Sequence, residues 1–194
     1  MEDLGTLGGS RSWATVVNDA GKIMGTSEVT VGANYLTSFL WEAGSLSDSG
    51  DFYRDISDLN ESGRYCGRYH FTGGTGGFLY DGASILRLPF SDAMSMNDNG
   101  WLVGGDHVLY QGYTVYTGAR LYIDGTTCDV NSLLDDPSPP DLNYANAINN
   151  LGQIIARGTP PGGGEDRWYL LTIVPEPSGM VLLLSGAAIL RRRR

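Results

Sequence analysis

The chain is poor in the residues that most often carry chemistry. Its 194 residues include two cysteines, two histidines and, among 13 basic residues, the single lysine Lys22. No H-E-x-x-H, Cys-x-x-Cys, P-loop or G-x-S-x-G motif occurs, so the usual markers of metal-dependent hydrolysis, nucleotide binding and serine hydrolysis are missing. Helical periodicity of useful length is also missing before residue 174. The sequence therefore offers no catalytic motif and favours an all-β chain.

Basic residues are outnumbered by acidic ones, 13 to 22, for a formal net charge of −9. Without the four terminal arginines, nine basic residues face the same 22 acidic ones, and the charge becomes −13. Such a surface disfavours nucleic acid as a partner. The simplest interpretation is the solvated surface of an exported protein. A polysaccharide or calcium contact stays open through the acidic residues Asp48, Asp51, Asp55 and Asp58, although no Asp-x-Asp-x-Asp-Gly loop supports calcium.

An internal repeat runs through most of the chain. Four segments share a strand-like run, an Asn, two mostly polar residues and a Gly that opens a second apolar run: Ala14–Gly25, Ile56–Gly67, Ala93–Gly104 and Ala145–Ala156. This pattern predicts a β-hairpin in which Asn caps the turn and Gly takes a positive φ. The residues with this structural role are Asn18, Gly21, Asn60, Gly63, Asn97, Gly100, Asn149 and Gly152.

A second recurring element lies between these hairpins. It consists of Phe39–Gly44 (FLWEAG), Phe78–Gly82 (FLYDG) and Arg120–Gly125 (RLYIDG), and it predicts a strand, a tight turn and a second strand. Each repeat then supplies about four short strands over roughly forty residues, as a propeller blade does. We therefore expect an all-β, β-propeller-like array of four repeats of about four short antiparallel strands, which forms one domain over residues 1–174. The proline-rich segment Asp135–Asp141 fits a loop at the rim.

The segment 174–194 combines three elements in a fixed order. The triplet Pro175, Glu176 and Pro177 lacks two backbone donors and should be extended and accessible. The uncharged run 178–190 follows, and the chain closes with Arg191, Arg192, Arg193 and Arg194. The run predicts a C-terminal apolar helix of about 20 Å, shorter than the ~30 Å hydrocarbon core, with the arginines on the cytoplasmic side. We expect transient membrane insertion through residues 178–190; an ordinary tail anchor and a buried C-terminal helix are the alternatives.

This order of elements resembles the PEP-CTERM sorting signal of Gram-negative bacteria. The resemblance covers Val174–Arg194 and rests on VPEP, the apolar run and the terminal RRRR. It implies an exosortase-type membrane protease as partner, processing at Pro175, Glu176 and Pro177, and the four arginines as a cytoplasmic basic stop. It further implies transient residence in the inner membrane, then a cell-surface or extracellular location, often with exopolysaccharide. Such proteins also carry a signal peptide, whereas this chain opens MEDLGTLGGS, so we expect the true start to lie upstream.

The first repeat resembles a second family. Residues Asp3–Gly25 resemble the HAF family of bacterial extracellular repeats, whose pattern runs DLGTLGG, S-x-A and I-N-x-x-G-x-V-V-G. The later copies keep only the Asn-x-x-Gly core. This resemblance favours an extracellular location and implies no active site.

The cysteines and histidines carry no recognisable site. Cys66 occupies an apolar strand position, and its register gives no reason to meet Cys128, although an oxidising periplasm would permit a disulfide. His70 and His107, the latter preceded by Asp106, are interpreted as solvated or strand-edge residues. We expect no catalytic, cofactor-binding or metal site.

The combined interpretation is an exported surface or extracellular-matrix protein, a binding or structural module associated with exopolysaccharide and delivered by C-terminal sorting. The alternative is an enzyme that acts on extracellular polysaccharide through carboxylates in the propeller channel, which two carboxylates about 5–9.5 Å apart across a cleft would favour. For the ends of the array, we expect Asp3 to begin in a blade's second strand and Arg167–Ile173 to pair antiparallel with Asp3–Leu7, which would close a four-bladed ring. In the alternative, the chain is a piece of a longer propeller.

Overall fold

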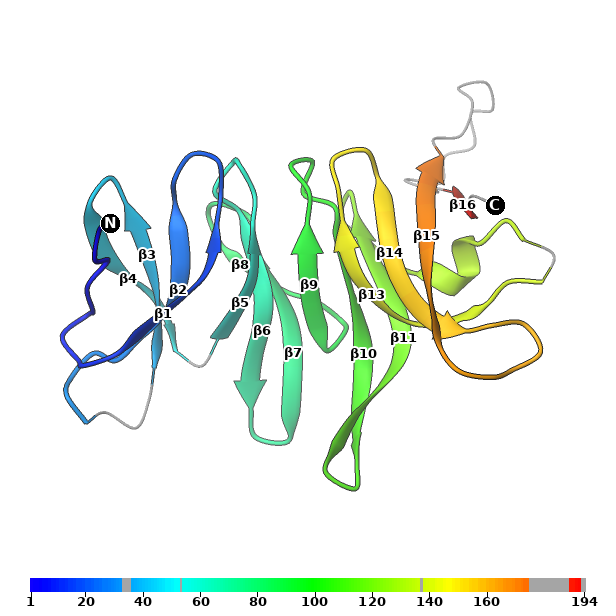
Figure 1. The fold of residues 1–194 in the computed structure, drawn as a ribbon, viewed down its shortest axis with the longest axis horizontal. Coiled ribbons are helices and arrows are strands. Elements are labelled where there is room, and N and C mark those ends of the chain that lie inside the picture. Colours follow the sequence, from blue (N-terminus) through cyan, green and yellow to red (C-terminus); the bar gives the residue numbers. More distant parts are fainter. Residues whose placement is uncertain (33–35, 53, 137, 175–188, 193–194) are drawn as a thin grey trace. The chain divides into compact units, whose positions relative to one another are not determined.

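The computed structural model describes residues 1–32, 36–52, 54–136, 138–174 and 189–192, and within them it contains sixteen strands and no α-helix (Figure 1). The strands form four antiparallel sheets of four strands each, in sequence order. Sheet 1 contains β1 (Ser12–Val17), β2 (Ile23–Ser27), β3 (Thr37–Glu42) and β4 (Ser45–Phe52). Sheet 2 contains β5 (Arg54–Leu59), β6 (Tyr65–Phe71), β7 (Gly74–Tyr80) and β8 (Ile85–Arg87). Each of these two sheets corresponds to one sequence repeat.

The other two repeats build the other two sheets in the same way, except that the fourth strand of sheet 4 comes from the C-terminal segment. Sheet 3 contains β9 (Asp92–Met96), β10 (Leu102–Tyr110), β11 (Tyr113–Ile123) and β12 (Thr126–Asp129), followed by the short 3₁₀ helix η1 (Val130–Leu133). Sheet 4 contains β13 (Asp141–Ile148), β14 (Gln153–Thr159), β15 (Arg167–Val174) and β16 (Ile189–Arg192). The predicted all-β fold with about four strands in each of four repeats is confirmed.

The chain divides into two compact units, residues 1–88 with sheets 1 and 2 and residues 89–194 with sheets 3 and 4. The core of the first unit contains Met24, Ile56, Leu59, Tyr65 and Phe78. The core of the second unit is larger and draws on β10, β11, η1, β13, β14 and β15. Each unit thus buries apolar side chains of two neighbouring sheets, and the burial of this surface stabilises the pair.

The strand–turn–strand prediction holds for the outer hairpins of sheets 1, 2 and 3; in sheet 2 the turn between β7 and β8 is closed by the Asp81 amide, which donates to the Ser84 carbonyl oxygen at 3.1 Å. The turn between β3 and β4 is Ala43-Gly44, and the turn between β11 and β12 is Asp124-Gly125. All four residues have positive φ, between 48° and 83°. Two central residues with positive φ define the type I′ turn, whose twist matches that of the flanking strands.

A β-bulge recurs in the first strand of every sheet, three residues before the turn asparagine. The extra residues are Thr15, Ser57, Met94 and Asn146. Opposite the bulge, a Cβ on the facing residue would come within 2.0, 1.9 and 1.8 Å of a carbonyl oxygen at Gly25, Gly67 and Gly104 respectively. Only glycine permits so close an approach of two backbones. Sheet 4 has Ala156 at this position, and its close approach lies at Gly158, where an added Cβ would come within 2.2 Å of the Asp141 carbonyl oxygen.

The first end of the array differs from the prediction. Sheet 1 takes all four of its strands from its own repeat, starting at Ser12, and Asp3–Leu7 lie outside the strands. The prediction that the chain begins within a blade's second strand is therefore wrong. The reason is that the first repeat itself supplies all four strands of sheet 1, so that no strand has to be added to it from the other end of the chain.

The other end differs as well. Strand β15 pairs with β14 on one edge and with β16 on the other, so that both edges are occupied within sheet 4. The predicted pairing of Arg167–Ile173 with Asp3–Leu7 is wrong for this reason. Residues 178–188 of the predicted C-terminal helix lie outside the described residues. For Ile189 and Leu190 the helix prediction is wrong, because their backbone pairs with β15.

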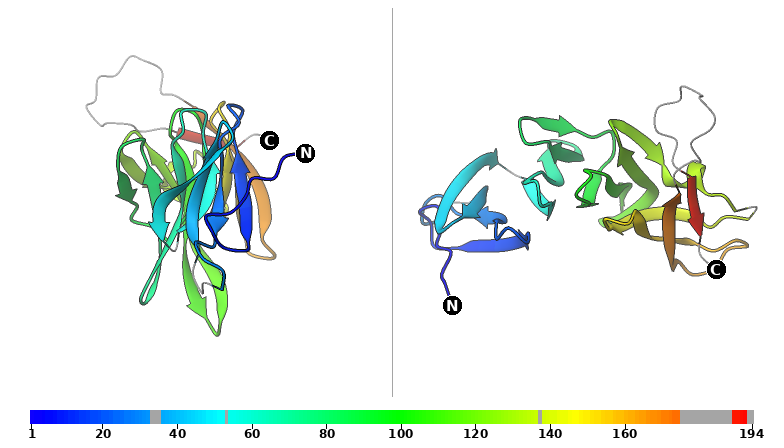
Figure 2. Two further views of the ribbon diagram at one scale, coloured as in Figure 1. Left: turned by 90° about the vertical axis from the view of Figure 1, so that its left-hand side faces the viewer. Right: turned by 90° about the horizontal axis from the view of Figure 1, so that it is seen from above.

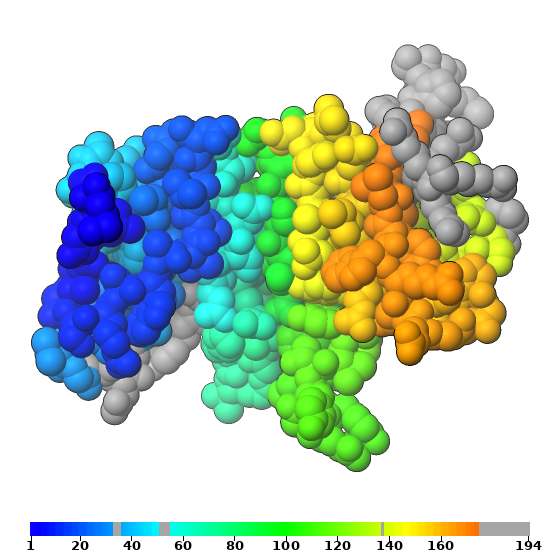
Figure 3. Space-filling model, in the orientation of Figure 1, coloured from blue at the N-terminus to red at the C-terminus, as the bar shows by residue number. Residues whose placement is uncertain are grey.

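The hairpin of β10 and β11 extends past the other strands of sheet 3 (Figures 1 and 2). Its tip forms the green prominence in the space-filling view (Figure 3). Several of its apolar side chains are exposed, namely Val108, Leu109, Tyr110, Tyr113 and Val115. The strands of this hairpin are thus longer than the sheet needs for its core.

Candidate functional site

Most of the predicted sorting segment lies outside the described residues. Outside them lie Pro175, Glu176, Pro177, Arg193 and Arg194, whereas Arg191 and Arg192 belong to β16. Over the part of the chain that the structure describes, no helix has the length and apolar character needed to cross a bilayer.

The Asn-x-x-Gly turns share one geometry in all four sheets. In the first turn, the Asn18 amide nitrogen donates to the Lys22 carbonyl oxygen at 3.1 Å, and the Lys22 amide nitrogen donates to Asn18 Oδ1 at 2.9 Å. The Gly21 amide nitrogen donates to the Asn18 carbonyl oxygen at 3.0 Å. The same three bonds recur at Asn60, Asn97 and Asn149. The four glycines have φ between 70° and 81°, the positive value that the turn chemistry requires.

The amide groups of two of these asparagines have a further role that sequence reasoning missed. Asn18 Nδ2 donates to the Asn60 carbonyl oxygen at 3.1 Å in the first unit, and Asn97 Nδ2 donates to the Asn149 carbonyl oxygen at 3.2 Å in the second. Each bond joins the turns of two neighbouring sheets. Asn18 and Asn97 are buried, and a buried amide needs such partners.

Side chains in the turns add a second connection between neighbouring sheets. In the first unit, the Glu61 carboxylate accepts hydrogen bonds from the amide nitrogens of Asp19 at 2.8 Å and Ala20 at 3.2 Å. In the second unit, the Asp98 amide nitrogen donates to Asn150 Oδ1 at 2.9 Å. The turn end of each unit is therefore a hydrogen-bonded scaffold rather than a reactive site.

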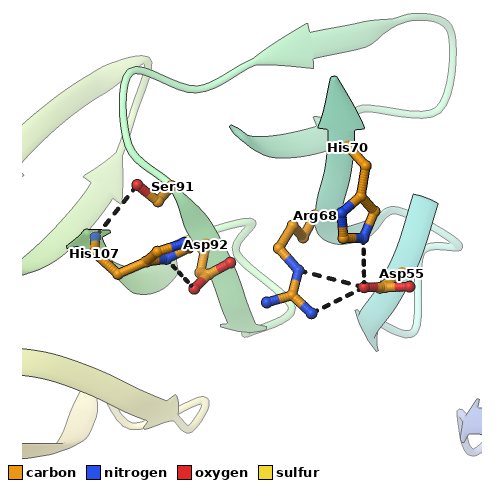
Figure 4. Close-up of polar contacts among 6 residues, drawn as sticks. All are labelled: Asp55, Arg68, His70, Ser91, Asp92 and His107. Carbon is orange, nitrogen blue, oxygen red and sulfur yellow. Dashed lines mark hydrogen bonds and ion pairs between the residues drawn. The ribbon is translucent and has the colours of Figure 1, made fainter. Parts of the chain in front are cut away.

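A second recurring polar position lies three residues after the strand glycine. In sheet 2 it is His70, whose Nε2 lies 3.0 Å from Asp55 Oδ2 (Figure 4). Arg68 Nη2 donates to the same oxygen at 2.9 Å. Burial raises the pKa of Asp55, but the bonds from His70 and Arg68 and the charge of Arg68 outweigh it, and the pKa lies below its ordinary value. The Asp55 carboxylate is half-exposed, at 50%.

The equivalent position in sheet 3 is His107. Its Nδ1 lies 2.8 Å from Asp92 Oδ2, and its amide nitrogen donates to Ser91 Oγ at 3.3 Å (Figure 4). The His107 and Asp92 side chains are only 10% and 2% exposed. Of the two interpretations, solvated or strand-edge, the first is therefore wrong for His107, because its side chain is largely buried against a carboxylate on the adjacent strand. Its sequence neighbour Asp106 instead binds Arg120 at 2.7 Å.

Sheets 1 and 4 have other polar residues at the same position. In sheet 1 it is Glu28, buried, whose carboxylate accepts bonds from Arg11 Nε at 2.8 Å and from the Ser10 hydroxyl at 2.9 Å. Hydrogen bonds from Arg11 and Ser10 lower the pKa of Glu28. In sheet 4, Thr159 Oγ1 donates to Asp166 Oδ1 at 3.0 Å. The repeat alignment brings these residues into register, and this is the signal that would have found them.

A pocket of about 220 Å³ lies between sheets 1 and 2 of the first unit. Its lining residues are Lys22, Met24, Leu40, Ser47, Asp48, Ser49, Leu59, Gly63, Tyr65 and Tyr80. The rings of Tyr65 and Tyr80 stack with centroids 4.6 Å apart and planes at 23°. The pocket is thus lined on one side by apolar core residues and the tyrosine pair, and on the other by hydroxyl groups and a carboxylate. This combination is typical of small-molecule sites.

A more open, polar pocket lies near the start of the chain. It is lined by Asp3, Gly5, Thr6, Ser10, Arg11, Ser12 and Trp13. The Arg11 guanidinium lies 5.6 Å from the centre of the Trp13 ring. Among the described lining residues, each of these two pockets has one carboxylate, Asp48 or Asp3, whereas glycoside hydrolysis usually uses two.

The acidic residues named in the sequence have separate partners. Asp48 Oδ1 accepts from Thr37 and Gly50, Asp55 binds Arg68 and His70, and Asp58 Oδ1 accepts from the Leu59 amide. The side chain of Asp51 lies outside the described residues. Within the described residues, no three His, Cys, Asp or Glu side chains are grouped to hold a metal ion.

Both cysteines are free thiols. Cys66 is fully buried on β6, where it pairs with Asp58 and Leu79 on the two adjacent strands. Burial and the nearby charge of Asp58 raise the pKa of Cys66 well above its ordinary value. Since the thiolate is the reactive form, Cys66 is a packing residue.

Comparison of the chain with protein-family models, curated proteins and solved structures found no match in any of the three. The case for a function therefore rests on the residues themselves.

Proposed function

We propose that the protein is an exported surface or extracellular-matrix protein that binds or organises exopolysaccharide and is delivered by its C-terminal segment. The observation that carries this proposal is that the chain builds the same kind of antiparallel sheet four times, each time with the same Asn-x-x-Gly turn. In repeat proteins the recurring residues build the scaffold, and the surfaces formed by neighbouring repeats serve for binding. The pocket between sheets 1 and 2, with its tyrosine pair, is such a face.

We further infer that the four sheets are blades of a β-propeller-like array. In support, each repeat corresponds to one antiparallel sheet and has roughly the length of a propeller blade; sheets 1 to 3 have four strands in sequence order, and sheet 4 has three before the tail. Neighbouring turns within each unit are joined by the asparagine amides. These bonds give a stack of blades a fixed spacing at one end.

The delivery part of the proposal rests on the sequence of the tail. A Pro-Glu-Pro triplet, an uncharged run and four arginines stand in the order that a processed membrane segment requires. An exosortase-type protease is the proposed partner, and residues 178–190 are the proposed membrane segment. The acidic remainder of the chain suits a protein that stays dispersed after release.

Two experiments test the two parts. Mass spectrometry of the mature protein from its native host should place its C-terminus upstream of Ser178; an exported form that keeps the terminal RRRR would overturn the sorting proposal. Co-sedimentation of the full chain with the host's own extracellular polysaccharide should retain the protein, with an unrelated acidic β-protein as control. Sedimentation no greater than that of the control would overturn the binding proposal.

A further inference from the structure

We propose that the pocket between sheets 1 and 2 binds one neutral pyranose ring of a polysaccharide chain. This inference rests on the proposed polymer binding and names its site. The pocket volume of about 220 Å³ is below the roughly 300–1,000 Å³ of sites for drug-sized ligands. It therefore suits one sugar ring and not an extended heterocycle or a nucleotide.

The floor of the pocket matches the apolar C–H face of a sugar ring. Tyr80 and Tyr65 are cross-strand neighbours on β7 and β6, and their stacked rings lie beside Met24 and Leu40. The Tyr80 hydroxyl donates to the Gly82 carbonyl oxygen at 3.1 Å, which fixes the ring. Rigid aromatic side chains of this kind supply contact area at a low entropic cost.

The rim of the pocket matches the hydroxyl groups of a sugar. Asp48 Oδ1 accepts bonds from Thr37 Oγ1 at 3.0 Å and from the Gly50 amide at 2.7 Å, so that the carboxylate is held in one orientation. Ser47 Oγ and Ser49 Oγ donate to backbone carbonyl oxygens at 3.2 and 2.9 Å, which leaves their lone pairs as acceptors. Oriented acceptors beside an aromatic floor select a ligand with several O–H donors.

The charges around the pocket select a neutral ligand. Lys22 is the one basic residue among the lining side chains described, and its Nζ is paired with Glu42 Oε1 at 3.1 Å. Among the described lining residues, an anionic sugar would meet the Asp48 carboxylate and a lysine that is already paired with Glu42. The net charge of −9 adds to this repulsion. Uronic acids and phosphates are thereby disfavoured.

The test measures binding of the full chain by isothermal titration calorimetry. The probes are neutral tetrasaccharides of glucose, mannose and galactose, with tetragalacturonate as the anionic comparison. We expect at least one neutral probe to bind, and tetragalacturonate to bind about tenfold more weakly or not at all. Equal binding of the anionic probe would overturn the assignment of a neutral sugar.

Two variants locate the site. Tyr80→Ala removes half of the aromatic floor and should weaken binding about tenfold, as truncation of an aromatic anchor does. Ser47→Glu places a charged side chain in the pocket without touching the core and should abolish binding. The matched controls are Tyr113→Ala on the β10–β11 hairpin and Ser45→Glu on the same strand as Ser47, which should bind like the unaltered chain.

The outcomes separate this inference from the proposed function. If the full chain retains the host polysaccharide but Ser47→Glu and Tyr80→Ala bind as well as their controls, the pocket is not the site, whereas polymer binding stands. If the unaltered chain binds neither the tetrasaccharides nor the polysaccharide, both proposals fail. Circular dichroism checks that Tyr80→Ala is folded. If Tyr80→Ala is unfolded, the binding of Ser47→Glu alone tests whether the pocket is the site.

Discussion

Sheets 2 and 3 carry the same Asp–His pair in two different environments. The Asp55 and His70 side chains are 50% and 46% exposed, and Asp55 also binds Arg68, whereas the Asp92 and His107 side chains are 2% and 10% exposed. Gly105 stands in sheet 3 where Arg68 stands in sheet 2, and Tyr116 packs edge-on against His107. The repeat thus fixes which strands bring the two residues together, and the packing around them fixes how strongly they interact.

This difference separates two kinds of residue in the repeat: those that keep the same geometry in every sheet and those whose environment varies from sheet to sheet. The turn asparagine and the strand glycine have the same geometry in both sheets, because the backbone path depends on them. The Asp–His pair does not determine the backbone path. One copy can therefore be buried while the other is exposed. An exposed pair contributes about 0–1 kcal/mol to stability, whereas removing one partner of a buried hydrogen bond costs about 1–3 kcal/mol.

The largest expected effect tests the scaffold that the two sheets share. Gly67→Ala and Gly104→Ala would each place a Cβ within 1.9 or 1.8 Å of a carbonyl oxygen, so each should lower the free energy of unfolding by about 3 kcal/mol. Urea denaturation measures the loss. Gly74→Ala is the control, because its Cβ would meet only the tip of the Phe71 ring, at 3.3 Å. A loss no larger than that of the control would show that the close approach relaxes freely.

The next effect concerns the turns. Gly63 and Gly100 both have φ of 81°, where a β-branched residue is strained. Gly63→Val and Gly100→Val should each cost about 1–3 kcal/mol. Thermal unfolding followed by circular dichroism measures the shift of the midpoint. An unchanged midpoint in one sheet alone would break the equivalence of the two turns.

A smaller effect should separate the two Asp–His pairs. Asp92→Ala leaves a buried histidine without its carboxylate and should cost about 1–2 kcal/mol, whereas Asp55→Ala should cost less than about 1 kcal/mol. Equilibrium urea denaturation of the two variants gives the difference directly. If the two substitutions cost the same, burial does not set the strength of the pair.

The smallest effect is a pH dependence. The pKa of Asp55 lies below its ordinary value of 3.8 in the folded protein, so the folded state favours the ionised form. The resulting stabilisation is present above about pH 4 and is lost as the pH falls through the folded pKa. Because Asp55 is half-exposed, solvent screening keeps this contribution to a fraction of a kcal/mol. The stability gap between the unaltered chain and Asp55→Asn should shrink from pH 7 to pH 3, and a constant gap would contradict this assignment.

Local sequence chemistry alone predicted most of the framework. The repeated Asn-x-x-Gly pattern specifies four turns, and turns of fixed type set the register of the strands beside them. The dipeptides Ala43-Gly44 and Asp124-Gly125 predicted the outer hairpins of sheets 1 and 3 in the same way. These inferences succeeded because a turn is decided by the φ and side-chain bonds of a few adjacent residues.

Only the tertiary structure decided which distant residues meet. Asp92 and His107 are fifteen residues apart, and the strand pairing of β9 with β10 brings them to 2.8 Å. The partner of β15 was likewise predicted wrongly: Asp3–Leu7 was expected, and β14 and β16 occupy its two edges. Strand edges look alike in sequence, and packing selects the partner. The pocket with Tyr65 and Tyr80 also has no local signature, because its walls come from two sheets. The sequence by itself determined the repeated sheet and its turns, while the contacts between strands and sheets required the fold, since they depend on burial summed over many residues.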